Sequence, residues 1–373
     1  MNSDQPSTTS TAVDVAEDAA QAAPRVVVVA TEPPLTASKR DSGVESAGDE
    51  DSAEANTSGA SDIRRPDATR IIAMINQKGG VGKTTSTVNL GAGLAHLGMR
   101  VLLIDLDPQA HLTLHLGVDP AELELSNYDL LVDDDVKAVD VIRQVQENLW
   151  VLPAEVNLAG AETELAPKLI TGRAQRVLKD KLDPLLADRV SGFASRVSGQ
   201  DNPPETPTAT PDTRHPTSDT RSFDYILLDC PPSLGLLTIN ALSFAKEVFV
   251  PMQAHFLALQ GLSKLLETVG FIRQGFNPQL VVSGVIVCMH EKQTLLAAEV
   301  TRDLNSFLEQ SREQDVPWRD AVMLEPMIRR NIKLAESPSF GATIFEYAPD
   351  SNGAEDYRTL AMSVARQRVK VTT

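Results

Sequence analysis

A short segment rich in glycine and lysine has the composition of a loop that binds nucleotide phosphates. The segment consists of Lys78, Gly79, Gly80, Val81, Gly82, Lys83, Thr84 and Thr85. Its glycines let the backbone approach a phosphate without a Cβ clash, and successive N–H groups before a helix N-terminus can surround the anion. Lys83 is placed to reach the β- and γ-phosphates, and the Thr84 hydroxyl to bind Mg²⁺. We predict a Walker A loop for ATP of the deviant kind, because Lys78 adds a second lysine and Gln77 replaces the usual glycine.

Three aspartates at the ends of apolar runs are candidates to complete this site. Asp229 ends one such run, which is the Walker B position, where a carboxylate holds Mg²⁺ through a water molecule. Asp105 and Asp107 are two residues apart, so in an extended chain they project to the same face. Either could lie near the γ-phosphate and orient the attacking water, and their spacing does not choose between them.

These residues belong to apolar runs that alternate with helical patterns. Strands are predicted at 71–76, 101–105, 149–153, 224–229, 247–251 and 280–288. Helices are predicted at 83–97, 159–187, 257–274, 294–313 and 354–370. Strands that alternate with helices form parallel sheets covered on both faces. The predicted fold is therefore α/β, a three-layer, doubly wound and mostly parallel sheet of the P-loop NTPase type with a deviant Walker A loop.

Two stretches of the chain lack the apolar residues that a core requires. Residues 1–66 carry 12 acidic and 5 basic side chains, a net charge of −7, and residues 198–222 contain five prolines among Thr, Asp and Ser. Such segments cannot bury enough apolar surface to offset their ordering entropy. We predict a disordered acidic tail at 1–66, an ATPase domain at 67–373, and a disordered insertion within that domain at about 198–222.

The charge of the chain bears on its partners. With a formal net charge of −17, the chain does not have the composition of a general nucleic-acid binder, so any DNA contact needs a local basic patch. The candidates for such a patch are Arg329, Arg330 and Lys333, with Lys292 and Arg302 added only if the fold brings them near. The alternative is an ordinary solvated face with surface ion pairs, which composition alone favours.

Other signals are typical of a cytosolic protein. Cys230 and Cys288 have no zinc-site spacing, the N-terminus has no secretory signal pattern, and no apolar run approaches the roughly 20 residues of a membrane-spanning helix. Cys230 directly follows Asp229, where an iron–sulfur cluster bridging two subunits is conceivable, but that would need a second suitably placed cysteine. We expect both cysteines to be buried as small apolar residues.

Several blocks of the sequence together resemble one family, the ParA-type chromosome-partitioning ATPases of the Soj group, which are relatives of the septum-site ATPase MinD and of the nitrogenase iron protein. The resemblance extends from about Ile71 to Arg368, apart from the insertion. Besides the loop it includes the blocks at 149–154, 157–162, 229–235, 260–262 and 330–341. The last block, Arg330 to Gly341, is characteristic of the partition branch.

The resemblance implies a function and assigns roles to residues. It implies an ATP-dependent homodimer that binds DNA without sequence preference, with a ParB-type partner protein that stimulates hydrolysis of ATP to ADP and phosphate. In this family the lysine at the position of Lys78 reaches the nucleotide of the partner subunit, and the aspartate at the position of Asp107 supports hydrolysis. The DNA-contacting basic residues of the family map onto Arg330 and Lys333. A cytoplasmic, nucleoid-associated protein without membrane contact is therefore expected.

The chain also departs from the family pattern. Gln293 stands where the family often has a basic residue, so one DNA contact is expected to be missing or moved to Lys292. His255 stands where an acidic residue is common. Two other functions are alternatives: a MinD-like ATPase that acts at a membrane surface, and a metabolic enzyme that shares the loop. The chain end at 357–370 is better interpreted as a last domain helix than as a membrane anchor, and no further substrate-binding constellation is evident.

Overall fold

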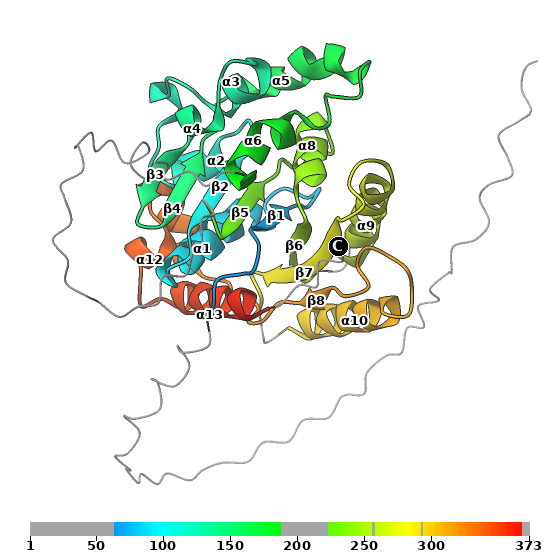
Figure 1. The fold of residues 1–373 in the computed structure, drawn as a ribbon. Helices are drawn as coiled ribbons and strands as arrows, with labels where there is room; N and C mark the ends of the chain where they lie inside the picture. Colours follow the sequence, from blue (N-terminus) through cyan, green and yellow to red (C-terminus); the bar gives the residue numbers. More distant parts are fainter. Residues whose placement is uncertain (1–62, 188–222, 256–257, 292–293, 368–373) are drawn as a thin grey trace, which may run out of the picture. The chain divides into compact units, whose positions relative to one another are not determined.

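The computed structural model describes residues 63–187, 223–255, 258–291 and 294–367 (Figure 1). The predicted tail, apart from its last four residues, and the predicted insertion at 198–222 lie outside these ranges, and so do Lys292 and Gln293. Within the described residues no helix is long and apolar enough to cross a membrane.

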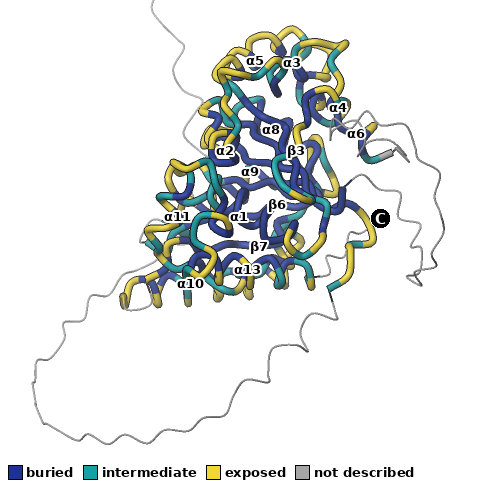
Figure 2. The backbone as a smooth tube through the Cα atoms, turned by 90° about the vertical axis from the view of Figure 1, so that its left-hand side faces the viewer, coloured by how far each residue is buried: buried dark blue, intermediate teal, exposed yellow. Residues whose placement is uncertain are grey.

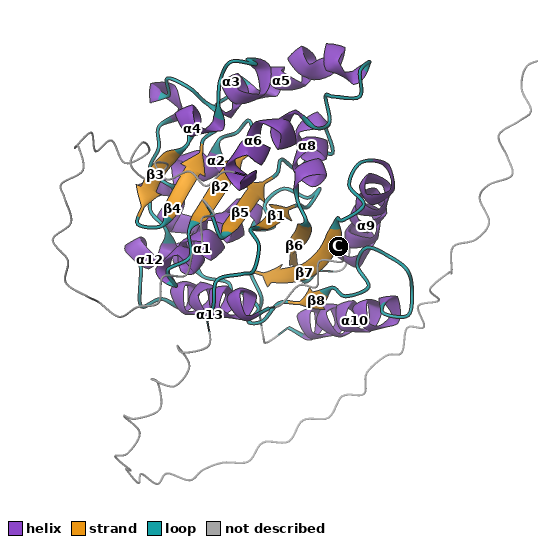
Figure 3. Cartoon of the chain, viewed as in Figure 1, coloured by secondary structure: helices purple, strands orange, loops and turns teal. Residues whose placement is uncertain are grey.

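A single sheet of eight strands organises the described part of the chain (Figure 3). In spatial order the strands are β3 (Arg143–Gln146), β4 (Leu149–Leu152), β2 (Val101–Asp105), β5 (Tyr225–Asp229), β1 (Arg70–Met74), β6 (Glu247–Gln253), β7 (Val281–Cys288) and β8 (Val322–Met323). Neighbouring strands are parallel except for β3, which is antiparallel to β4. The predicted doubly wound, mostly parallel α/β fold is confirmed.

Helices cover both faces of the sheet. One face carries α3 (Asn127–Val132), α4 (Ala138–Val141), α5 (Leu158–Leu165), α6 (Val177–Ala187), α8 (Leu236–Phe244), α9 (Ala258–Gly275) and α10 (Leu295–Ser311). The other carries α1 (Lys83–His96), α2 (His111–His115), α11 (Ile332–Glu336), α12 (Ile344–Tyr347) and α13 (Asn352–Arg366). Short 3₁₀ turns lie at η2 (Pro120–Glu122), η3 (Ala166–Leu169) and η4 (Ser337–Phe340).

The alternation of side chains along each strand divides the core in two. Ile71 and Ala73 of β1 belong to the cluster under α8 and α9, whereas Ile72 and Met74 belong to the cluster under α1 and α13. Every residue of β1, β2 and β5 is buried, as Figure 2 shows for the centre of the sheet. A strand buried on both faces is a continuous apolar run, which is why these strands are recognisable in the sequence.

One predicted helix is corrected. The stretch 159–187 was expected to be a single helix, but α5 ends at Leu165, η3 follows, and α6 begins only at Val177. Pro167 lies in the first turn of η3, and Gly172 adopts a positive φ of 68°. Proline disfavours the helix interior because it lacks an N–H and its ring clashes with the preceding turn, and a left-handed glycine is typical of a helix end, so the helical pattern is interrupted there.

Candidate active site

The glycine-rich loop joins the central strand β1 to α1 at the carboxyl end of the sheet, where ligands of open parallel sheets bind. Gly80 and Gly82 have φ values of 72° and 95°, a backbone conformation that side chains disfavour. A Cβ on Gly82 would also lie 3.3 Å from Cys288, so the loop could not keep this path with a larger residue. The loop therefore has the conformation that its glycines predict.

The two lysines of the loop have different surroundings. Lys83 is 7% exposed, and its Nζ donates a hydrogen bond of 3.4 Å to the carbonyl of Lys78, across the loop. Lys78 is exposed, and its Nζ lies 2.6 Å from Nε2 of His255. The Lys83 ammonium thus points into the loop, whereas the Lys78 ammonium points away from it, toward His255.

The end of β6 supports the loop from the side. Asn76, just before the loop, donates from Nδ2 to the carbonyl of Pro251 across 2.8 Å. Gln253 donates from Nε2 to the carbonyl of Gly80 across 3.0 Å. Sequence reasoning missed Gln253, because a contact between residues so far apart in the chain leaves no local pattern.

Asp229 lies beside the start of α1, as predicted. Its two carboxylate oxygens accept hydrogen bonds from Thr84 Oγ1 at 2.6 Å and from Thr87 Oγ1 at 3.1 Å. The carboxyl is fully buried, and this burial raises its pKa to about 6, against the opposing effect of the two hydroxyls and of Lys83. A cation next to Asp229 would stabilise the ionised form that burial disfavours.

The donor set fits Mg²⁺, which prefers oxygen ligands and keeps several waters. Thr84 supplies a hydroxyl and Asp229 a carboxylate within one hydrogen bond of each other. Among the described residues no group of three or more His, Cys, Asp or Glu side chains could hold a metal by itself. A cation here would take its other ligands from phosphate and water.

Asp105 and Asp107 differ in what their carboxylates contact. Asp105 is fully buried and accepts from the backbone N–H and hydroxyl of Thr113, at 2.9 and 2.7 Å, and from the N–H of Asp107 at 3.1 Å. Burial first, and then the charge of Asp229, raises the pKa of Asp105 to about 7. Asp107 is only half-buried, and its Oδ1 accepts from the N–H of Gln109 at 3.0 Å. Asp105 thus shapes the turn that presents Asp107.

A cavity of about 550 Å³ lies next to the loop. It is lined by Gly82, Thr85, Cys288, Met289, Ile328, Arg329, Arg330, Asn331, Ile332, Leu334, Ala335 and Tyr357. Most of these side chains are apolar, which suits a flat, weakly polar group. One wall is formed by Gly82 of the phosphate loop and Thr85 at the start of α1, and a second wall is formed by the segment 328–335, except Lys333.

Arg329, Arg330 and Lys333 lie in or next to the second wall, and each is paired with a carboxylate. Arg302 lies on α10 and is not part of the cavity lining. Arg329 contacts Asp356 and Glu355, each at 2.6 Å. Arg330 lies 2.6 Å from a carboxylate oxygen of Glu291, and its side chain is 72% exposed. Lys333 lies 2.9 Å from a carboxylate oxygen of Glu336, and its side chain is 46% exposed. Asp356 is buried, so its pairs with Arg329 hold the segment to α13, whereas the other two pairs lie at the surface. Lys292 is outside the described residues.

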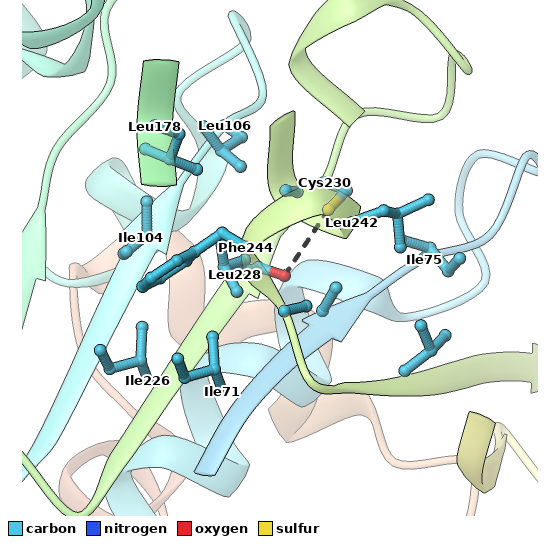
Figure 4. Close-up of a cluster of buried hydrophobic side chains, with 14 of the residues drawn as sticks. Ile71, Ile75, Ile104, Leu106, Leu178, Ile226, Leu228, Cys230, Leu242 and Phe244 are labelled. Atoms are coloured by element: carbon cyan, nitrogen blue, oxygen red, sulfur yellow. Dashed lines mark hydrogen bonds between the residues drawn. The ribbon is translucent and has the colours of Figure 1, made fainter. Parts of the chain in front are cut away.

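Both cysteines are buried, as expected. Figure 4 shows Cys230 among apolar side chains, with its Sγ 3.9 Å from the carbonyl of Leu228. Burial raises the pKa of the Cys230 thiol well above its usual range, and raises that of Cys288 to about 11. Burial thus disfavours the thiolate form of both cysteines, which agrees with their role as small apolar core residues.

Comparison with known proteins places these features in context. A family model described as an AAA domain matches residues 69–188 and 217–282. The chain is 41% identical to the sporulation initiation inhibitor protein Soj of Bacillus subtilis, over 79% of this chain and 98% of Soj. It is 34% identical to the chromosome partitioning protein ParA of Caulobacter vibrioides, over 80% of this chain and 95% of ParA.

A solved structure is also similar. It is the cobyrinic acid a,c-diamide synthase of Mycobacterium smegmatis with bound ADP and magnesium, at 32% identity and a TM-score of 0.58. The match covers 80% of this chain and 94% of that one.

Proposed function

Because this chain belongs to the ParA/Soj family of chromosome-partitioning ATPases, and is itself an ATPase, we propose that it is an ATP-dependent DNA-binding switch for chromosome or plasmid segregation. In this proposal two protomers associate when each holds ATP and Mg²⁺, and the dimer binds DNA without sequence preference. A ParB-type partner then stimulates hydrolysis and returns the protein to monomers. Its place is the cytoplasm, on the nucleoid.

The proposed nucleotide position follows from the loop and the cavity. The phosphates occupy the loop from Lys78 to Thr85, and the adenosine occupies the 550 Å³ cavity, of which Gly82 and Thr85 form one edge. Lys83 binds the β- and γ-phosphates, and Thr84 binds Mg²⁺ directly, while Asp229 binds it through water. Bound Mg²⁺ supplies a positive charge that offsets the charge of the reacting phosphates.

Hydrolysis needs a group that orients the attacking water. We assign this role to Asp107, because it is half-buried at the carboxyl end of β2, while Asp105 is occupied with Thr113. Asp105 is then a positioning residue, since it accepts the backbone N–H of Asp107. Removal of the Asp107 carboxylate would leave the phosphate-binding groups in place.

One observation carries the dimer proposal: the loop has two lysines, and only Lys83 points into it. The Lys78 ammonium is exposed and directed outward, where a second protomer can approach. A Lys78→Ala variant should therefore bind ATP but dimerise poorly with it. Light scattering with ATP and Mg²⁺, in an Asp107→Ala background that retains the nucleotide, measures this. Dimerisation equal to that of Asp107→Ala alone would rule out the cross-subunit role.

The DNA surface is proposed at the segment 328–335, which forms the second wall of the cavity. Arg330 and Lys333 are its more exposed cations, and Arg329 is held mainly by Asp356 and Glu355. Since residues 328–335 line the proposed adenosine cavity, a nucleotide would contact the segment that binds DNA. Two weak patches joined in one dimer bind more tightly than one, which gives DNA binding its dependence on ATP.

Two other functions remain to be tested against this one. A MinD-like protein would bind anionic vesicles in the presence of ATP, and a sedimentation assay beside a DNA gel shift separates the two. The similar amide synthase represents the metabolic class, but the chain is more closely related in sequence to Soj, at 41% against 32% identity. Turnover that requires a small-molecule acid would favour that class.

A further inference from the structure

His255 lies in the segment that leaves β6 and contacts the phosphate loop on its outer side. Pro251 and Gln253 contact the loop through Asn76 and Gly80, and His255 contacts it through Lys78. β6 ends at Gln253, and the chain turns there, because the N–H of His255 bonds to the carbonyl of Gln253 at 3.0 Å; beyond this turn the His255 ring lies beside Lys78. The His255 contact is thus the third contact between this part of the chain and the region of the loop.

The chemistry of the two groups determines the form of the imidazole. A lysine ammonium has three N–H donors and no acceptor, so a nitrogen that bonds to it must accept. Nε2 of His255 lies 2.6 Å from Lys78 Nζ, which makes it the accepting nitrogen. An imidazole that accepts through Nε2 is neutral and carries its proton on Nδ1. The contact therefore selects one tautomer.

Ordering Lys78 in advance has a consequence for dimer assembly. A lysine side chain loses much rotamer freedom when it is immobilised, and groups that are already ordered lose less on binding. We propose that His255 is a positioning residue for Lys78, holding its ammonium at the mouth of the loop before a second protomer arrives. This inference rests on the proposed function, in which Lys78 contacts the nucleotide of the partner protomer.

The contact itself can be tested without dimerisation. The ¹⁵N chemical shifts of the His255 ring at neutral pH should report a neutral imidazole protonated on Nδ1 in the nucleotide-free protein. In Lys78→Ala this signature should be lost. A ring that is protonated on Nε2, or one that is unaffected by Lys78→Ala, would overturn the proposal.

The role of the contact needs a double-mutant cycle. His255→Leu removes the acceptor, and we expect ATP-dependent dimerisation to weaken by about two- to ten-fold, the range of one net hydrogen bond. His255→Gln retains an acceptor oxygen and should restore most of the affinity. In a Lys78→Ala background, His255→Leu should have no further effect. Unchanged or tighter dimerisation of His255→Leu would overturn the positioning role.

The cross-subunit role of Lys78 and the positioning role of His255 can be disproved separately. If Lys78→Ala dimerises like the wild type, the cross-subunit role is wrong, yet the ring shifts still decide whether the contact exists. If His255→Leu does not fold, the tautomer measured in the wild type and in Lys78→Ala still tests the inference.

Discussion

The hydroxyl of Thr84 donates a hydrogen bond to a carboxylate oxygen of Asp229 across 2.6 Å. The bond joins the start of α1 to the end of β5. Both groups are proposed to serve Mg²⁺, and this bond is compatible with that role, because a hydroxyl that donates its hydrogen to Asp229 keeps its oxygen lone pairs for a cation. The relationship indicates that the metal site is assembled before the metal arrives.

Replacement of Lys83 tests the loop. Lys83→Ala removes the ammonium proposed to hold the β- and γ-phosphates, and we expect ATP binding to fail. Fluorescent ATP titration measures this, with circular dichroism to show that the fold is retained. Normal binding and hydrolysis by the variant would mean that the loop assignment is wrong.

Replacement of Asp107 separates binding from turnover. Asp107→Ala should retain ATP, lose hydrolysis and accumulate as a dimer, because only the group that orients water is removed. Phosphate release and size-exclusion chromatography with ATP measure the two effects. Hydrolysis at the wild-type rate would exclude Asp107 as the group that orients the attacking water and would favour Asp105 in that role.

The buried aspartates predict how stability depends on pH. Burial raises the pKa of Asp105 to about 7 and that of Asp229 to about 6, from an ordinary value of 3.8. Between these values the two carboxyls keep protons in the folded protein that the unfolded chain has lost, and this lowers the free energy of unfolding as pH rises. Burial lowers the pKa of His115 from 6.5 to about 4, which acts in the opposite direction and offsets the effect of one of the two carboxyls. For each carboxyl the slope is at most about 1.4 kcal/mol per pH unit.

Urea unfolding of the nucleotide-free protein between about pH 4 and pH 7 measures this slope. Asp105→Asn removes one of the two carboxyls and should flatten the dependence. A stability that rises with pH over the same range in the wild type would contradict the prediction.

A double charge reversal tests the DNA surface. Arg330→Glu with Lys333→Glu should abolish ATP-dependent DNA binding, and because Arg330 also lines the proposed adenosine cavity, ATP binding and dimerisation of the variant are measured as controls. Wild-type binding should weaken steeply with salt, because the contacts release counterions from DNA phosphates. Undiminished binding by the double variant would place the surface elsewhere.

Replacement of Arg329 should lower the free energy of unfolding, and the same replacement of its neighbour Arg330 is the matched control. Arg329→Ala leaves Asp356, which is 4% exposed, without its arginine, and we expect a loss of about 2 kcal/mol in the free energy of unfolding. Arg330→Ala breaks only a surface pair with Glu291, so its unfolding curve should match that of the wild type. Equal stability of the two variants would show that the Asp356 contact is unimportant.

The strands that the sequence predicts are those buried on both faces. All six predicted strands are present, since β1, β2, β4 to β7 are apolar runs with few polar residues. β3 was missed because it is an edge strand whose side chains are exposed or half-buried, and β8 because it has only two residues. α8 was missed because nearly all its residues are buried, so it has no polar face to give a helical period.

The site was predictable where a local motif encodes it. The loop and Asp229 lie where the motif requires, because strand, turn and helix are contiguous in the chain. The difference between Asp105 and Asp107 was not predictable from their spacing, since it depends on Thr113, eight residues on and beyond a turn. The support from Gln253 and His255 comes from a strand that is adjacent only in the folded sheet.

The strand order has a consequence for synthesis of the chain. β5 lies between β1 and β2 in the sheet, although it follows both of them and β4 along the chain. While the nascent chain is still shorter than 225 residues, the centre of the sheet lacks its strand, and the loop lacks the carboxylate that faces Thr84. Domains form as units as chains leave the ribosome. Nucleotide with Mg²⁺, bound as proposed, would therefore stabilise only chains long enough to include both Asp229 and the segment 328–335 that lines the cavity.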